Sequence, residues 1–364
     1  MADVLIAPRP APATHHGWQA WIRAQLAATP ASALASALML GAFLWWLPEL
    51  WSWAVGRAQF SPSAALCRAE GVGACWGVVT EKYRVILLGR YPLEEAWRPI
   101  AATLLLLLMV VASCVRRCWR PALMLAWLAA LALGWWFMHG GAGLSRVETE
   151  RWGGLPLTIL LSTLSIALAF PLAVLLALGR RSKLPAVRTV CATYVEMVRG
   201  VPLVSVLFMA SFMFPLLMPQ GMTVDVLLRV LAGISLFAAA YMAEVVRGGL
   251  QALPQGQTEA AASLGLSYWQ TQRRIVLPQA LATVVPGLMN NFIAIFKDTS
   301  LVTIVSLYEL TGSLGLALNS DADWRPFKLE AYLFIALIYF VFCLAMSRYS
   351  SRVEQDLKRG RTHD

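Results

Sequence analysis

Long apolar runs bounded by basic residues constrain the fold of this chain more than any other feature. Residues 155–179 carry no charged side chain and are followed directly by Arg180, Arg181 and Lys183. A run of this length can cross the hydrocarbon core of a bilayer as a helix. The chain is 59% hydrophobic and only 14% charged, against about 25% charged residues in soluble proteins. The sequence therefore predicts an all-α polytopic integral membrane protein.

About eight spans can be placed along the chain. We predict them at 34–55, 99–115, 121–138, 155–179, 202–217, 226–246, from 279 onward, and at 329–346. The seventh is interrupted by Lys297 and Asp298. Residues 184–200 have an amphipathic pattern and are not predicted to span. An even number of spans places both termini on the same side of the membrane.

The basic residues set the expected orientation. With both termini in the cytoplasm, the inner side receives the basic turns at 116–120 and 180–188 and the basic C-terminal tail. This follows the rule that Lys and Arg collect in short cytoplasmic loops, which long loops such as 56–98 obey weakly. The net charge of +10 is then a topology signal, and nucleic acid is not an expected partner.

We divide the chain into four parts. Residues 1–30 and 351–364 are predicted cytoplasmic tails. Residues 31–151 form an N-terminal extension of three spans with a periplasmic loop at 56–98, and residues 152–350 form a core of five spans. The loop contains Cys67 and Cys75, which are a possible disulfide because an oxidising compartment allows one.

The polar break at 248–278 separates the sixth and seventh spans and is predicted to form an elbow of two short helices. Thr258 is placed to cap a helix over 259–264, and Gly265 is placed to end that helix. This first helix has a small, alanine-rich surface that suits close docking on a soluble partner.

The second helix of the elbow is predicted to start at a capping box formed by Ser267 and Gln270. Pro278 is expected to close the segment just before the next apolar run. An ordinary connector between two spans is the alternative interpretation of residues 248–278.

The residues Glu259-Ala260-Ala261, then Gly265, then Ile275-Val276-Leu277-Pro278 resemble the EAA loop of ABC importer permeases. The resemblance implies that Glu259, Ala260, Ala261 and Gly265 form the coupling helix that contacts an ATPase subunit. No GxxxxGK[ST] phosphate loop occurs in the chain. ATP and Mg are therefore expected on the partner, with no cofactor and no metal bound by this chain.

Two Glu-x-x-Arg-Gly elements flank the fifth and sixth spans. Glu196 and Arg199, and likewise Glu244 and Arg247, are three residues apart and can face each other on a helix. Gly200 and Pro202 should break the helix after the first pair. Both strings resemble signatures of polar amino-acid ABC permeases, although many relatives have Thr where this chain has Val201. We assign the pairs to gating or coupling at the cytoplasmic face; surface ion pairs are the alternative.

The charged break in the seventh span is a candidate substrate pathway. A charge within a membrane segment is costly, which favours a functional role for Lys297 and Asp298. The following Thr299 and Ser300 offer hydroxyls, and Asn290 and Asn291 lie one to two turns earlier. The string resembles the Lys-Asp-[ST]-Ser-Leu motif of the same permeases. The alternative is that these residues only mark the outer end of the helix.

Together the motifs resemble permease subunits of histidine/glutamine-type ABC importers, and the three extra spans resemble the M-type subunit of general L-amino-acid transporters. This implies a five-helix type I importer core in a bacterial inner membrane, with no enzymatic activity of its own. The implied partners are an ATPase dimer, a homologous permease subunit, a periplasmic binding protein and an L-amino acid. An ion-gradient-driven secondary transporter that uses Asp298, and a membrane scaffold without transport, are the competing classes.

Overall fold

The protein is described by a computed structural model that covers residue 22, residues 25–219 and residues 221–361. These residues are almost entirely helical, and the described ranges contain isolated bridges but no β-strand. The all-α prediction is confirmed. The chain divides into two compact units, Met1–Gly77 and Val78–Asp364, and each is described by itself.

The first unit contains one long apolar helix. Helix α2 (Pro30–Trp51) begins at a capping box formed by Thr29 and Ser32, and it continues into a π turn at Ser52–Gly56. No residue of α2 is buried, as expected of a helix whose whole surface faces lipid.

The chain that follows α2 folds back on itself as a small group of loops. A short helix, α3 (Ala64–Cys67), brings Cys67 to Cys75, and the two form a disulfide with a Cα–Cα distance of 5.5 Å. Cys75 also forms a bridge with Gln59. The Trp76 indole Nε1 donates to the carbonyl oxygen of Ala54 at 2.8 Å, which ties the loop to the end of the long helix.

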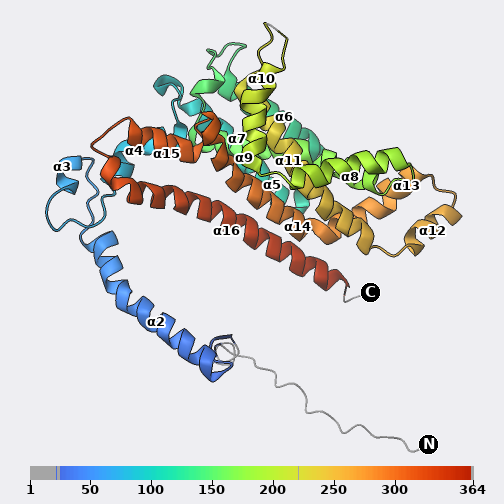
Figure 1. The fold of residues 1–364 in the computed structure, drawn as a ribbon, viewed down its shortest axis with the longest axis horizontal. Coiled ribbons are helices and arrows are strands. Elements are labelled where there is room, and N and C mark those ends of the chain that lie inside the picture. The colour runs from blue at the N-terminus through green and yellow to red at the C-terminus, as the bar shows by residue number, and fades with distance from the viewer. Residues whose placement is uncertain (1–21, 23–24, 220, 362–364) are drawn as a thin grey trace, which may run out of the picture. The chain divides into compact units, whose positions relative to one another are not determined.

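The second unit is a bundle of helices (Figure 1). The elements are α4 (Gly77–Leu88), α5 (Trp97–Cys114), α6 (Pro121–His139), α7 (Gly154–Arg180), α8 (Pro185–Arg199), α9 (Leu203–Phe208), α10 (Phe214–Leu216), α11 (Val226–Ala252), α12 (Gly256–Ser263), α13 (Tyr268–Thr271), α14 (Leu277–Asp298), α15 (Leu310–Asn319) and α16 (Lys328–Arg361).

Helix α11 lies at the centre of this bundle. It packs against α7 and α14, while α14 also packs against α16, and α5 packs against both α6 and α7. Across the described residues, seven helices are long and apolar enough to span a membrane, or eight if one bent pair is counted as a span. The prediction of about eight spans is confirmed. The division of the chain at residue 151 stays a prediction.

The second arm of the bent pair corresponds to the predicted fifth span, whereas the first arm, α8, covers residues that were not predicted to span. Helix α8 and the run from α9 to α10 meet at an angle of 104°. Gly200 caps the end of α8, and Pro202 is extended and precedes α9, so both predicted helix breakers act as expected. The run Leu203–Leu216 is about 21 Å long at 1.5 Å per residue, which is shorter than the hydrocarbon core of a bilayer.

The region predicted as the loop 56–98 is more ordered than expected. It includes α4, and α5 begins at Trp97, so Arg98 lies inside a helix and is 1% exposed. The Arg98 guanidinium pairs with Glu95 and donates to the carbonyl oxygens of Phe137 and Ser145. Hydropathy alone could not indicate this, because the helix and the arginine are held by contacts with residues remote in sequence.

An ion pair connects α4 to the loop before α16. The Lys82 ammonium donates to the Asp321 carboxylate at 2.9 Å. This hydrogen bond, with a second one from the backbone of Asp323, holds the pKa of the Asp321 carboxyl below its ordinary value.

Candidate functional site

The first helix of the elbow, α12, begins at Gly256 with Gln255 as its N-cap. The predicted cap at Thr258 is wrong, because Thr258 lies inside the first turn, where the carbonyl of Gln255 accepts from its backbone N–H. Gly265 ends the helix with φ +75°, as predicted. Its N–H donates to Ala262, and the N–H of Leu266 donates to Ala261, which is the Schellman pattern.

The second helix of the elbow runs into the next span. The capping box of Ser267 and Gln270 is present as predicted. The prediction that Pro278 closes the segment is wrong, since the chain is helical from Tyr268 to Val305. A π turn at Gln272–Val276 directly precedes α14, where Pro278 occupies the first turn. The wide turn tolerates the missing N–H and the ring of proline.

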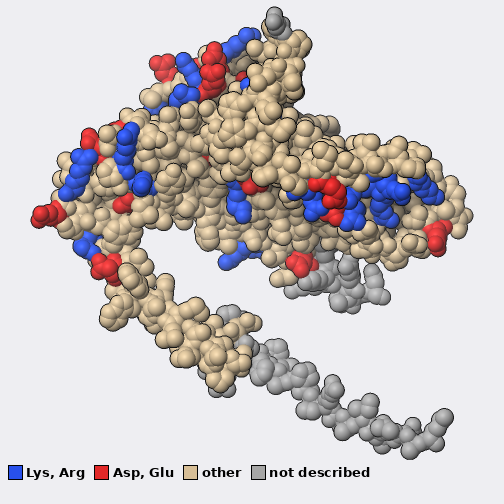
Figure 2. All heavy atoms as spheres, in the orientation of Figure 1, with Lys and Arg blue, Asp and Glu red and all other residues tan. Residues whose placement is uncertain are grey.

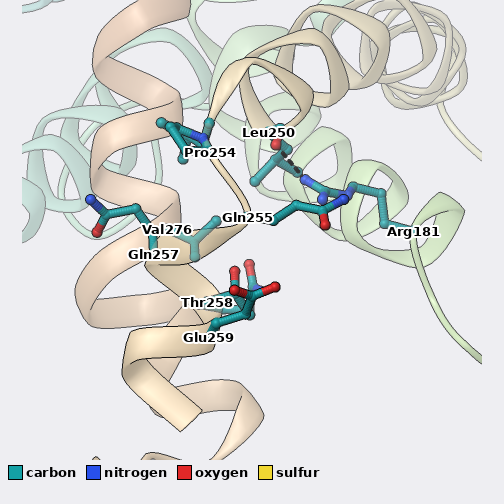
Figure 3. A pocket seen from close by; sticks show the side chains of 10 residues that line it. Arg181, Leu250, Pro254, Gln255, Gln257, Thr258, Glu259 and Val276 are labelled. Atoms are coloured by element: carbon teal, nitrogen blue, oxygen red, sulfur yellow. Dashed lines mark hydrogen bonds between the residues drawn. The ribbon is translucent and has the colours of Figure 1, made fainter. Parts of the chain in front are cut away.

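Three of the four predicted coupling residues face outward. Glu259, Ala260 and Gly265 are exposed, whereas Ala261 is 1% exposed and packs beneath α12. Figure 3 shows the pocket beside this helix, with Thr258 and Glu259 on one side and Arg181 on the other. It is lined by Arg181, Leu250, Leu253, Pro254, Gln255, Gln257, Thr258, Glu259, Gln272 and Val276.

A group of charged side chains, which we call the charge cluster, joins α7, α8 and α11. It consists of Arg180, Glu196, Arg199, Glu244 and Arg247. The Arg180 guanidinium donates to Glu196 at 2.7 Å and to Glu244 at 2.9 Å, so one side chain links two helices. Arg247 forms a bidentate pair with Glu244, as the three-residue spacing predicted.

The other expected pair is replaced by longer-range contacts. In the described chain Glu196 pairs with Arg180 and not with Arg199. Arg199 instead lies over the Tyr241 ring, 5.6 Å from its centroid, and 4.0 Å from Glu244. The role of Arg180 as the bridge was not predicted, since its sequence signal was only that of a basic flank.

The charge cluster and the elbow lie at the same end of the bundle. Arg181, the residue after α7, donates to the carbonyl oxygen of Leu250 in the last turn of α11, and α12 follows α11 after three residues. Figure 2 shows Lys and Arg gathered over α8 at this end of the second unit. The residues proposed for coupling and those proposed for gating are thus brought together.

The candidate pathway residues lie at the opposite end of α14. This helix has 22 residues and is therefore about 33 Å long. It ends at Asp298, and a 3₁₀ turn over Thr299–Val305 follows, so the chain stays helical but changes geometry at the predicted position, and we call this change the break. Asn291 donates to the carbonyl oxygen of Gly287 within its own helix.

The side chains at this break have different surroundings. Lys297 is exposed, Asp298 and Ser300 are half-buried, and Thr299 is fully buried with its hydroxyl bonded to the carbonyl oxygen of Phe296. Among the described residues the Asp298 carboxylate accepts no hydrogen bond and forms no ion pair, and Lys297 is the charge that acts on it. A half-buried carboxylate of this kind can accept a cationic or ammonium group.

A fully buried glutamate near this break escaped the sequence analysis. Glu309 is 0% exposed and caps α15 by accepting from the N–H groups of Thr311 and Gly312. It follows an apolar run directly and matches no motif, so only a cap signal before α15 pointed to it.

Comparison with known proteins gives consistent results. The model of the family described as "Binding-protein-dependent transport system inner membrane component" matches residues 169–359. The chain is 45% identical to the inner membrane amino-acid ABC transporter permease protein YhdY of Escherichia coli (strain K12), over 100% of both chains. It is 34% identical to the glutamate/glutamine/aspartate/asparagine transport system permease protein BztC of Rhodobacter capsulatus, over 98% of this chain and 97% of that protein.

Among solved structures, an amino acid ABC transporter with histidines aligns at 30% identity and a TM-score of 0.49, over 56% of this chain and 92% of that chain. The family match covers more than half of the sequence, and both relatives align along essentially its full length. This protein belongs to the binding-protein-dependent transport system inner membrane component family.

Proposed function

We propose that this chain translocates L-amino acids across a bacterial inner membrane as one permease subunit of an ABC importer. A permease subunit is not itself an enzyme, and the ATPase is a separate subunit. The observation that carries the proposal is the exposed elbow beside the charge cluster, in a chain whose full-length relatives are named as amino-acid permeases.

The elbow is the proposed contact with the ATPase. Its first helix exposes Glu259 and Ala260 and ends at an exposed glycine, so a partner can approach the backbone closely. Two ATPase subunits, which bind ATP and Mg, close on this helix and on its counterpart in a homologous permease. In this proposal the elbow and both chain termini lie in the cytoplasm, and the basic residues around α8 support that orientation.

The charge cluster is the proposed gate next to the elbow. Arg180 holds carboxylates of α8 and α11 together, and a shift of α12 reaches α11 through only three linking residues. The break at Lys297–Ser300, with Asn291, is the proposed substrate pathway, reached from a periplasmic binding protein. Residues 152–350 form the importer core, and residues 31–151 form an extension.

Uptake into proteoliposomes tests the proposal. The vesicles hold this chain with its co-purified membrane partner and ATPase, and the binding protein and a panel of radiolabelled amino acids are outside. We expect uptake that needs ATP inside the vesicles and is unchanged by ionophores. The matched controls are vesicles assayed without the binding protein and vesicles without internal ATP.

Uptake that does not depend on ATP, and that is lost when ionophores dissipate the ion gradient, would contradict the proposal. It would favour a secondary transporter in which Asp298 couples the ion. Uptake of none of the amino acids, with an assembled and ATP-hydrolysing complex, would contradict the substrate class alone.

A further inference from the structure

Glu309 connects four separate elements at the end of the bundle that holds the candidate pathway. Its Oε1 accepts from the N–H groups of Thr311 and Gly312, at 2.8 and 3.0 Å, and from the Thr303 hydroxyl at 3.1 Å. Its Oε2 accepts from the Tyr339 hydroxyl at 2.8 Å and from the Thr158 hydroxyl at 3.4 Å. These partners belong to α15, to the 3₁₀ turn after α14, to α16 and to α7.

All of these hydrogen-bond donors are neutral. Two are backbone N–H groups at the start of α15, where the helix dipole also favours a negative charge. The remaining three are hydroxyls. The Thr158 hydroxyl accepts from the N–H of Leu310 and shares its single proton between Glu309 and the carbonyl oxygen of Gly154, which is nearer at 3.1 Å. A buried carboxylate that lacks such partners is costly, so this residue holds its neighbours in one arrangement.

The same contacts bracket the segment Lys297–Ser300 from both sides. After the segment, Thr303 in the 3₁₀ turn donates directly to Glu309. Before the segment, the ring of Phe296 packs edge-on against the ring of Tyr339, with centroids 5.5 Å apart. Because the Tyr339 hydroxyl donates to Glu309, both ends of the segment are fastened to one carboxylate.

We propose that Glu309 is a positioning residue that fixes the break at Lys297–Ser300 within the translocation pathway. It does so by tying the 3₁₀ turn and α16 to the start of α7 and of α15. The transport role of that break rests on the proposed function, whereas the structural role of Glu309 in holding the segment does not.

The accessibility of position 300 to a thiol reagent tests directly whether Glu309 holds the segment Lys297–Ser300 in place. A Ser300→Cys reporter is placed in the complex, with Cys114, Cys118, Cys191 and Cys343 replaced by alanine, and its labelling by a soluble thiol reagent is timed. Glu309→Ala should speed labelling by about tenfold or more, because it leaves buried donors unpaired and favours local opening. Glu309→Gln should have a smaller effect, since its amide oxygen still accepts from the backbone of α15.

Two controls separate local loosening from general unfolding. Ser320→Ala, near the far end of the same helix α15, should leave labelling at position 300 unchanged. A second reporter, Ser263→Cys on α12, should label at the same rate with or without Glu309. If Glu309→Ala does not assemble, Tyr339→Phe tests the same contact, because it removes the hydroxyl and keeps the ring against Phe296.

Equal labelling rates in the parent, Glu309→Ala and Tyr339→Phe would overturn the proposal. In the uptake assay we expect these variants to raise KM more than they lower kcat, with unchanged ATPase co-purification. Faster labelling together with no amino-acid uptake even by the parent complex would refute the proposed function and leave the fixing of the segment intact.

Discussion

Two glycines of the elbow differ in whether the backbone at their position requires glycine. Gly265 has φ +75°, which side-chain-bearing residues rarely adopt, and a Cβ added there would meet nothing within 4 Å. Gly256 also has open space around it, but its backbone is helical. A substitution at Gly265 therefore carries a purely conformational cost, and the same change at Gly256 carries none.

The change Gly265→Ala should weaken docking of the ATPase. Forcing alanine into the left-handed region costs roughly 1 kcal/mol, which corresponds to about a fivefold loss of affinity if the partner needs this end of α12 in place. The measurement is the amount of ATPase that co-purifies per permease. Gly256→Ala is the matched control and should retain the parent amount; equal loss in both variants would contradict the role of the helix end.

At the scale of elements, α11 and α14, the two helices on either side of the elbow, approach each other closely at Gly249. A Cβ on Gly249 would lie 2.7 Å from the carbonyl oxygen of Ala280 and 2.6 Å from Val284. The adjacent Gly248 has nothing within 4 Å of such an atom. The two helices that flank the elbow thus touch backbone to backbone on one face only.

We expect Gly249→Ala to push these helices apart and to destabilise the protein by about 1–3 kcal/mol. Gly248→Ala should be neutral or slightly stabilising, because alanine favours the helix. Thermal unfolding of the two variants in the same detergent provides the measurement. A lower midpoint for Gly248→Ala than for Gly249→Ala would contradict the packing argument.

Local chemistry explains which elements could be predicted from the sequence. The capping box at Ser267, the glycine at 265 and the break at Gly200 and Pro202 each depend on a few neighbouring residues. Hydropathy likewise predicted the spans. The start of α12 was misplaced by a plausible cap at Thr258, and α4 was missed because it is only weakly apolar.

Contacts between distant residues account for what could not be predicted. The bridge from Arg180 to Glu244 spans 64 positions, and the bond between Thr158 and Glu309 spans 151. No spacing rule relates residues so far apart. The sequence therefore indicated which end of each helix carries charge, but not which charges of different helices meet.

For the whole molecule, the separation of the two candidate sites predicts separate defects. Asp298 lies about 33 Å along α14 from the elbow side. Asp298→Asn should lower amino-acid uptake by about tenfold or more, as expected when a charged hydrogen bond to a substrate is lost. Expression and ATPase co-purification should stay unchanged.

Ser320→Ala, at the exposed end of α15 and outside the candidate pathway, is the control for the Asp298 variant and should transport normally. Unchanged uptake kinetics in Asp298→Asn would restrict this carboxylate to a structural role. Loss of the co-purified ATPase would show that the two ends of α14 do not act separately.

Helix α14, Leu277–Asp298, connects the elbow at its first turn to the break at its last turn. A stiff helix hardly shortens or bends along its length, so movement at its base reappears at its tip. A tilt of roughly 5° at the base would swing the far end of a ~33 Å rod by roughly 3 Å. In the proposed importer, movement of the ATPase against the elbow would then shift Asp298 sideways, and Pro286 inside α14 is the position at which this helix bends most readily.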